Sequence, residues 1–336
     1  MKGEGALRVA HFSDLHYGPR NLDEADRCFA AAIERALALG VQAAVISGDS
    51  TDHALDLHSP AAVALVSRVR CLADHCPVLM LQGTWSHEPP GTLSVFRELG
   101  GRYPVHVADR IGQVGLSAAG RWVASTGWCF ERLPEGLRAL VSCLPTVNRA
   151  AVAAAAGAAD AASATGEHIA ALLRGLAPVH AQARALGLPT LLVSHGTVFG
   201  CLSEHGVPMA GFDHEFTTGG LFDAGAQAVL LGHIHRHQRW ESDGAVGRQC
   251  IAYAGSIGRF HHGEAGDKGF LFWHIGAHAA ACRLEATPAR RTLDIRFDGK
   301  PELDALRAAL AEQPAEGAWV RLRWSVAEEE RHSGRQ

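Results

Sequence analysis

Carboxylate and imidazole side chains follow short apolar runs in this 336-residue sequence, where they could bind metal ions. Asp14 and His16 come after the first run, and residues two apart in an extended segment point to the same side. Asp49 comes after the second run, directly behind Gly48, which permits a tight backbone turn. An ordinary capped loop or Gly-Asp turn would explain each motif alone. The two motifs therefore count only as part of a larger set.

Imidazoles complete that set at the ends of two later apolar runs. His195 follows Leu191 to Ser194, and His233 and His235 follow Ala228 to Leu231 in the segment Gly-His-Ile-His. Alternation again places the last two rings on one side of the chain. His195 alone would fit a buried, hydrogen-bonded histidine equally well. The paired histidines favour metal binding more strongly.

Taken together, these positions form a ligand set of nitrogen and oxygen atoms without cysteine. Such a set suits Mn, Fe, Zn or Ni better than a soft metal or an all-oxygen calcium site. A bridging carboxylate at Asp49 would hold two divalent ions roughly 3.5–4 Å apart, the spacing that two-metal hydrolysis of phosphate esters requires. The sequence predicts two divalent metal ions bound by Asp14, His16, Asp49, His195, His233 and His235.

The elements that must position these ligands alternate between strand and helix patterns. Residues 23–39 have apolar residues at helical spacing, early acids and a stop at Gly40. This pattern predicts an α/β fold in which polar residues at strand ends converge on one rim of a sheet. Buried strands are predicted at residues 8–12, 43–47, 78–81, 191–194, 228–231, 251–253 and 269–275.

Two later regions differ from this alternation. Residues 145–186 are rich in alanine, which favours one or two helices over a flexible linker. After about Thr287 the pattern predicts a strand, a helix over residues 301–310 and a second strand, so a small β-α-β domain. We therefore expect a catalytic domain at 1–284 and a small domain at 285–336. The charged tail leaves open whether the small domain is complete.

The ordered motifs Asp-x-His, Gly-Asp, a Gly-and-His loop, His and Gly-His-x-His resemble the calcineurin-like metallophosphoesterase superfamily over about Val9 to His235. That resemblance implies a two-sheet α/β sandwich with helices outside and a dinuclear metal centre. Residues 144–150 (LPTVNRA), residues 253–270 (YAGSIGRFHHGEAGDKGF) and the small C-terminal domain resemble the SbcD nuclease family. This narrower resemblance implies DNA as substrate, manganese as metal, a capping role for the C-terminal α+β piece, an SbcC-like coiled-coil ATPase partner and a homodimer.

The third motif departs from the family pattern. Family members usually have Gly-Asn-His followed by an acid, whereas this chain has Gly83-Thr84-Trp85-Ser86-His87-Glu88. If His87 and Glu88 match the usual pair, two residues are inserted and Ser86 stands where the ligating Asn is expected. By the resemblance, His87 is a general acid or transition-state donor. A surface loop histidine is the alternative, and Asp52 is expected to orient a neighbouring histidine.

Cationic side chains near these motifs are candidates for contacts with substrate phosphates, although solvated surface positions would suit each of them too. The net charge of −4 provides no global basic field, so any DNA contact must come from a local patch. The candidates are Arg20, Arg149, Arg259, His261, His262 and Lys268.

Composition sets the remaining expectations. The chain is 47% hydrophobic and 20% charged, has no run long enough for a membrane span and has eight cysteines without a Cys-x-x-Cys pair. We expect free thiols and a cytoplasmic protein. The predicted function is metal-dependent hydrolysis of phosphodiesters in DNA. The alternatives are a phosphodiesterase for small molecules or nucleotides, and a non-catalytic module that binds DNA ends or an ATPase.

Overall fold

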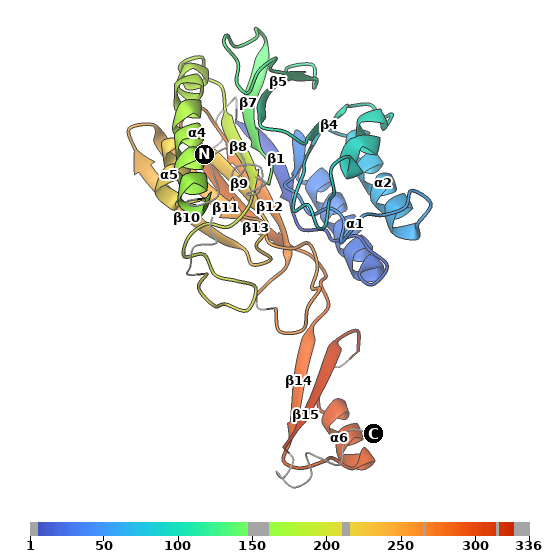
Figure 1. The fold of residues 1–336 in the computed structure, drawn as a ribbon. Helices are drawn as coiled ribbons and strands as arrows, with labels where there is room; N and C mark the ends of the chain where they lie inside the picture. The colour runs from blue at the N-terminus through green and yellow to red at the C-terminus, as the bar shows by residue number, and fades with distance from the viewer. Residues whose placement is uncertain (1–5, 147–160, 210–215, 265, 314–315, 326–336) are drawn as a thin grey trace.

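Two stacked β-sheets with helices on both outer faces form the body of the protein (Figure 1). A computed structural model describes residues 6–146, 161–209, 216–264, 266–313 and 316–325. The predicted α/β fold class is confirmed. No helix within these ranges is both long and apolar enough to cross a membrane.

The first sheet has six strands in the order β13-β12-β1-β2-β3-β4. Strands β1 to β4 are parallel, and β12 and β13 add an antiparallel edge beside β1. The bounds are β1 (Leu7–Phe12), β2 (Ala43–Ile46), β3 (Val78–Leu81), β4 (Val105–Ala108), β12 (Gly269–Ile275) and β13 (Ala280–Ala286).

The second sheet has seven strands in the order β10-β11-β9-β8-β7-β5-β6. Its central strands β7, β8, β9 and β11 are parallel, and the outer strands are antiparallel to their neighbours. The bounds are β5 (Gly112–Ser117), β6 (Trp122–Ala124), β7 (Leu137–Leu144), β8 (Thr190–His195), β9 (Ala228–Gly232), β10 (Gln238–Gly244) and β11 (Gly247–Tyr253).

Helices cover the outer face of each sheet. The first sheet packs on α1 (Leu22–Ala38) and α2 (Pro60–Ala73), and the second on α4 (Ala161–Ala185) and α5 (Thr218–Asp223). A short 3-10 helix, η1 (Thr92–Glu98), precedes β4. Ser59 caps α2 by accepting the Ala62 N–H at 3.3 Å, and Pro60 follows at the first helical position.

Both faces of the central strands are buried, which explains why their sequences are continuous apolar runs. In β2, Ala44 and Ile46 pack toward the helices, and Val45 packs between the sheets. The inner layer includes Trp273 of β12, which is fully buried. These layers hold the strand ends rigidly, so the loops that follow them have fixed starting points.

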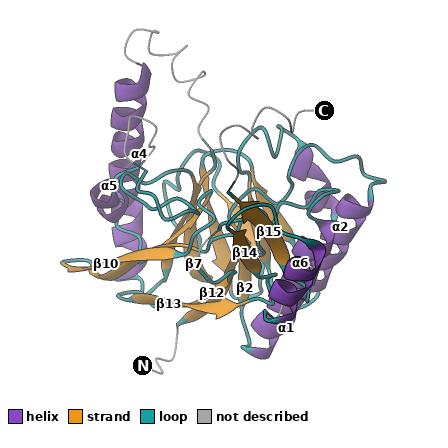
Figure 2. Cartoon of the chain, turned by 90° about the horizontal axis from the view of Figure 1, so that it is seen from below, coloured by secondary structure: helices purple, strands orange, loops and turns teal. Residues whose placement is uncertain are grey.

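The C-terminal piece consists of β14 (Thr292–Phe297), α6 (Leu303–Ala311) and β15 (Trp319–Trp324). The two strands form a parallel pair, and the piece projects from one end of the body (Figure 1). In the view from below, β14, β15 and α6 lie in front of the body on the side of α1 and α2 (Figure 2). The expected β-α-β order is present, and strand β13 continues two residues past the predicted boundary at 284. The division into domains stays a prediction.

A buried carboxylate joins this piece to the body. Glu24 of α1 accepts the N–H groups of Arg259 and Arg290, at 3.0 and 2.9 Å. Its other oxygen pairs with the guanidinium groups of Arg27 and Arg290, and Arg290 lies 3.7 Å above the ring of Trp319. Glu24 therefore links α1 to the segment that leads into β14.

Candidate metal centre

The loops after β1, β2 and β9 are bonded to one another at the same edge of the sandwich. Asp14 N–H donates to Gly48 O at 3.1 Å, and His16 N–H donates to Asp49 O at 3.0 Å. His233 N–H lies 3.1 Å from Asp14 Oδ1, which ties the second sheet to the first. The convergence of strand ends expected from the α/β pattern is present here.

Four of the predicted ligands have strained backbones. Asp14, His16, Asp49 and His233 are the non-glycine residues with positive φ in the described part of the chain, at 50°, 47°, 51° and 97°. This region is costly for residues with a Cβ atom, and such strain concentrates at functional sites. The observed clustering therefore supports a functional role for this edge of the sheets.

Glycines allow the ligands to approach each other. Gly48 has φ of 101°, and a Cβ atom there would lie 2.3 Å from His195 Nδ1. A Cβ atom at Gly83 would lie 2.3 Å from Asp49 Oδ1. Both positions therefore require glycine, because any side chain would push these ligands apart.

The first ligand group consists of Asp14, His16 and His235, whose ligand atoms all lie within 4.8 Å of one another. The Nε2 atoms of the two imidazoles are 2.9 Å apart, and His235 Nε2 lies 4.0 Å from Asp14 Oδ1. The two histidines therefore direct the same ring nitrogen to one point. All three residues come from strand ends predicted from the sequence.

The second ligand group consists of Asp49, His195 and His233, again within 4.8 Å. His195 Nε2 lies 3.2 Å from Asp49 Oδ2, and both side chains are buried. The predicted bridging of two metals by Asp49 stays a prediction. The structure thus brings all six predicted strand-end ligands into two neighbouring groups.

The outer nitrogens of the histidines show which atom is free to bind a metal. His195 Nδ1 lies 2.8 Å from Ser47 O, and a carbonyl can only accept, so Nδ1 carries the proton. His16 Nδ1 lies 3.6 Å from Asp52 Oδ1. With protons on the outer nitrogens, the Nε2 lone pairs face inward. In that tautomer the Nε2 lone pairs of His16 and His235 face each other across 2.9 Å, so these residues fit a bound metal.

Thr84, rather than the predicted Ser86, reaches this centre. Thr84 N–H donates to Asp49 Oδ1 at 2.6 Å, and its hydroxyl lies 3.2 Å from both Asp49 Oδ2 and His195 Nε2. Ser86 is exposed in the same loop. The prediction placed the two inserted residues before the ligand position, which led to Ser86. In the structure, the residue directly after Gly83 makes the contact with Asp49, and the extra residues follow it.

His87 lies beside the first ligand group as its predicted role requires. Its ring is 4.9 Å from that of His16, and its Nδ1 donates to Asp52 O at 2.7 Å. The Asp52 carboxylate and both rings form a third cluster of candidate ligands within 4.8 Å. Asp52 therefore contacts His16 through its carboxylate and His87 through its backbone.

Glu88 is a structural residue to which the sequence reasoning gave no role. It is fully buried and accepts the N–H groups of Ser50 and Gly83, each at 2.5 Å. Burial raises the pKa of this carboxyl to about 7, and the charge of Asp49 adds to the effect. Glu88 thereby holds together the loops that follow β2 and β3.

Among the protein's own groups, the Asp49–His195 pair dominates the electrostatics of the centre. Burial by itself lowers the pKa of His195, but the charge and hydrogen bond of Asp49 outweigh it and raise this pKa to about 10. Burial likewise opposes ionisation of Asp49, whereas the neighbouring His195 brings its pKa below the ordinary value. The Asp49–His195 pair therefore holds a proton at a position where a bound cation could replace it.

The predicted phosphate contacts fare differently. Lys268 is buried and ion-paired with Glu264, so its prediction as a substrate contact is wrong. The Arg259 guanidinium donates to the carbonyls of Arg290 and Gly266, at 2.5 and 2.7 Å. His262 Nε2 lies 3.4 Å from Leu293 O. These three side chains serve the fold.

Two candidates are accessible, and one of them contacts the centre. His261 is exposed, and its ring stacks on that of His235 at 6.2 Å. Arg20 is also exposed, four residues after His16. Arg149 lies outside the described residues.

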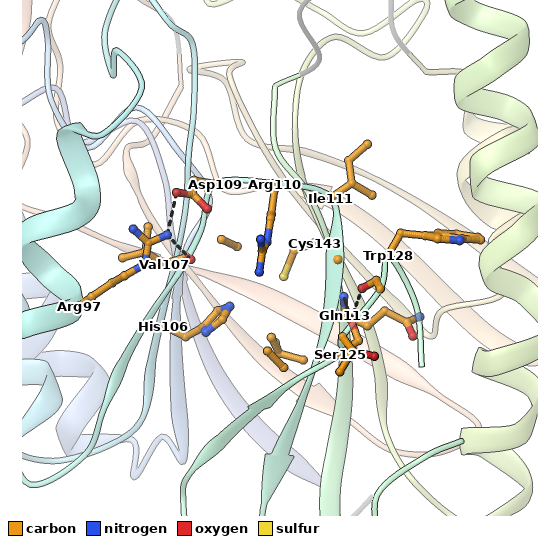
Figure 3. A pocket seen from close by; sticks show the side chains of 16 residues that line it. Arg97, His106, Val107, Asp109, Arg110, Ile111, Gln113, Ser125, Trp128 and Cys143 are labelled. Carbon is orange, nitrogen blue, oxygen red and sulfur yellow. Dashed lines mark hydrogen bonds and ion pairs between the residues drawn. The ribbon is translucent and has the colours of Figure 1, made fainter. Parts of the chain in front are cut away.

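A cavity of about 590 Å³ lies elsewhere, between the edge strand β4 and strands β5 and β6 (Figure 3). An ion pair between Arg97 and Asp109, at 2.7 Å, stands at one side, and Arg110 points inward. None of the candidate metal ligands is among its lining residues. The predicted chemistry therefore belongs to the strand-end loops and not to this cavity.

No family model matches the chain, and no curated protein matches it. Among solved structures, the chain is similar to a dimetal phosphatase from Danio rerio, with 10% sequence identity and a TM-score of 0.43. The match covers 84% of this chain and 99% of the other.

Proposed function

We propose that the chain is a metal-dependent hydrolase of phosphate esters. The observation that carries this proposal is the pair of largely buried carboxylate–imidazole groups, in the first of which two Nε2 atoms converge. Divalent ions bound there would supply positive charge to a phosphate and acidify a water molecule. A structural metal site normally fills all coordination positions of one ion. Two adjoining ligand groups therefore favour a catalytic centre over a structural site.

The surrounding side chains would divide the remaining work. His195 and His16 keep their rings oriented through Nδ1, by Ser47 O and the Asp52 carboxylate. His87 also donates Nδ1–H to a carbonyl, so a second proton on Nε2 would be available to the leaving oxygen. We expect His87 to act as this general acid, with Asp52 as its positioning residue.

The finer proposal is that the substrate is a phosphodiester in DNA. It is supported by the sequence resemblance to SbcD nucleases and by the positions of His261 and Lys268, which lie directly against His235. Arg20 and His261 are exposed and near the motifs that supply the ligands. They are the contacts that we expect a DNA phosphate to use.

A smaller phosphodiester is the second candidate, and one observation favours it. Lys268 and Arg259, both expected to bind DNA phosphates, are engaged within the protein. This leaves fewer cations for an extended polyanion, whose binding normally relies on several phosphate contacts. A nucleotide or other small diester needs fewer of them.

One experiment separates these candidates. Protein supplied with Mn²⁺ is assayed on linear duplex DNA, single-stranded DNA and a chromogenic phosphodiester, with Asp49→Ala as control. Cleavage of DNA by the wild type alone supports the nuclease, and cleavage of the small diester alone supports the alternative. Salt-sensitive DNA binding without any cleavage would favour a non-catalytic binding module.

The partner proposals rest on the resemblance. An SbcC-like ATPase and a second copy of the chain are the proposed partners, in keeping with a cytoplasmic DNA-processing complex. The C-terminal piece exposes Leu303 by 60% and Trp324 by 47%, and α6 has no buried residue. We expect a partner to cover these side chains. If that partner is a second copy of the chain, the molar mass of the purified protein measured by light scattering should be that of a dimer.

A further inference from the structure

A buried ion pair lies behind the first ligand group, in loop 256–268. Glu264 is 3% exposed and Lys268 is 2% exposed, and the two side chains are in direct contact. Charged side chains are seldom buried so completely unless they have a specific partner and purpose. Neither residue is one of the six strand-end ligands.

Both members of the ion pair lie against His235. Lys268 Nζ donates to His235 O at 2.8 Å and to Ser256 Oγ at 2.9 Å. Glu264 Oε1 lies 3.7 Å from His235 Nδ1, on the side of the ring opposite the ligand nitrogen. Ring and backbone of this one ligand are thus both held by the same ion pair.

Backbone N–H groups of the same loop hold the Glu264 carboxylate in position. Its Oε1 accepts the N–H groups of His261 and Phe260, at 2.9 and 3.3 Å. These contacts give the Glu264 carboxylate one preferred position.

We propose that Glu264 is a positioning residue that selects the tautomer of His235 and aims its Nε2 at the first metal position. The inference rests on the proposed metal-dependent function. A carboxylate that accepts from Nδ1 fixes the ring and leaves Nε2 as the ligand atom, and it makes that atom more basic. Lys268 holds Glu264 in place through their ion pair and so supports the same positioning role.

The two ligand groups then differ in how their histidines are held. His235 in the first group depends on an anionic side chain, whereas His195 in the second depends on the neutral carbonyl of Ser47. Loss of Glu264 should therefore weaken one metal position and spare the other. Outer partners of metal-binding histidines typically change affinity by about 10–100-fold.

Mn²⁺ titration of metal-free protein, followed by calorimetry, tests this difference. We compare wild type with Glu264→Gln and Glu264→Ala, and use Asp267→Asn as the matched control because Asp267 is an exposed acid of the same loop. The expected result is one binding step weakened about 10–100-fold, more by Ala than by Gln, and one step unchanged. Wild-type behaviour is expected of Asp267→Asn.

Three results overturn the inference. Equal affinities in wild type and both Glu264 variants would refute it and leave the proposed function standing, whereas a wild type that binds no Mn²⁺ would refute both. Should the variants fail to fold, nitrogen NMR of imidazoles in Zn²⁺-loaded wild type decides the matter. The inference predicts the Nδ1–H tautomer for His235, and an Nε2–H tautomer would overturn it.

Discussion

The hydroxyl of Thr84, the residue directly after Gly83, lies 3.2 Å from Asp49 Oδ2. A hydroxyl is neutral and has one oxygen, so it can complete a metal position or orient Asp49. In either role it should matter for the second ligand group, because it also lies 3.2 Å from His195 Nε2.

Thr84→Val should weaken metal binding with little effect on folding, since valine has nearly the same shape. We expect a loss of about tenfold in Mn²⁺ affinity, equivalent to about 1.4 kcal/mol. Calorimetric titration measures it. Ser86→Ala is the matched control, and the assignment is wrong if Ser86→Ala loses affinity and Thr84→Val does not.

These two residues also show what sequence could and could not predict. The six strand-end ligands were predictable, because apolar runs mark the strands and the polar residues directly after them converge by topology. Ser86 was misplaced because an insertion can be absorbed at either end of a loop. Lys268 was misassigned because its partner Glu264 is recognisable only when the loop is folded.

Metal affinity should rise with pH below about 10. Metal-free His195 has a pKa raised from 6.5 to about 10 by Asp49, so it is protonated at neutral pH and must release that proton when metal binds. Titrations in buffers of different ionisation enthalpy count the released protons. Binding without proton release between pH 6.5 and 9 would show that His195 is not displaced from its ion pair.

In the metal-free protein, the same pair should stabilise the fold at low pH. Because the folded pKa of His195 is raised, its contribution is fully present below about 6.5 and is lost as pH rises through about 10. Denaturant unfolding across this range measures the change. His195→Gln should flatten the profile, and an unchanged profile would exclude the pair as its source.

Glu88→Ala should destabilise the protein by about 2–5 kcal/mol, because it leaves the buried N–H groups of Ser50 and Gly83 without an acceptor. Glu88→Gln retains an acceptor oxygen and should cost less. Urea unfolding compares the two. Equal stability of Glu88→Ala and wild type would show that the loops after β2 and β3 do not depend on this side chain.

Glu24→Gln should loosen the joint to the C-terminal piece, because the buried charge that pairs with Arg27 and Arg290 is removed. Hydrogen exchange at residues 287–291 should become faster while strands β1 to β3 keep their protection. Asp23→Ala, an exposed neighbour, serves as control. Unchanged hydrogen exchange at residues 287–291 in Glu24→Gln would show that Glu24 does not hold the C-terminal piece to the body.

The central claim is that two metal ions bind at the strand ends, and anomalous diffraction from crystals soaked in Mn²⁺ tests it most directly. The account predicts two peaks of anomalous density. One should lie among Asp14, His16 and His235, and the other among Asp49, His195 and His233. A single peak, or density at neither group in a fully soaked crystal, would contradict it.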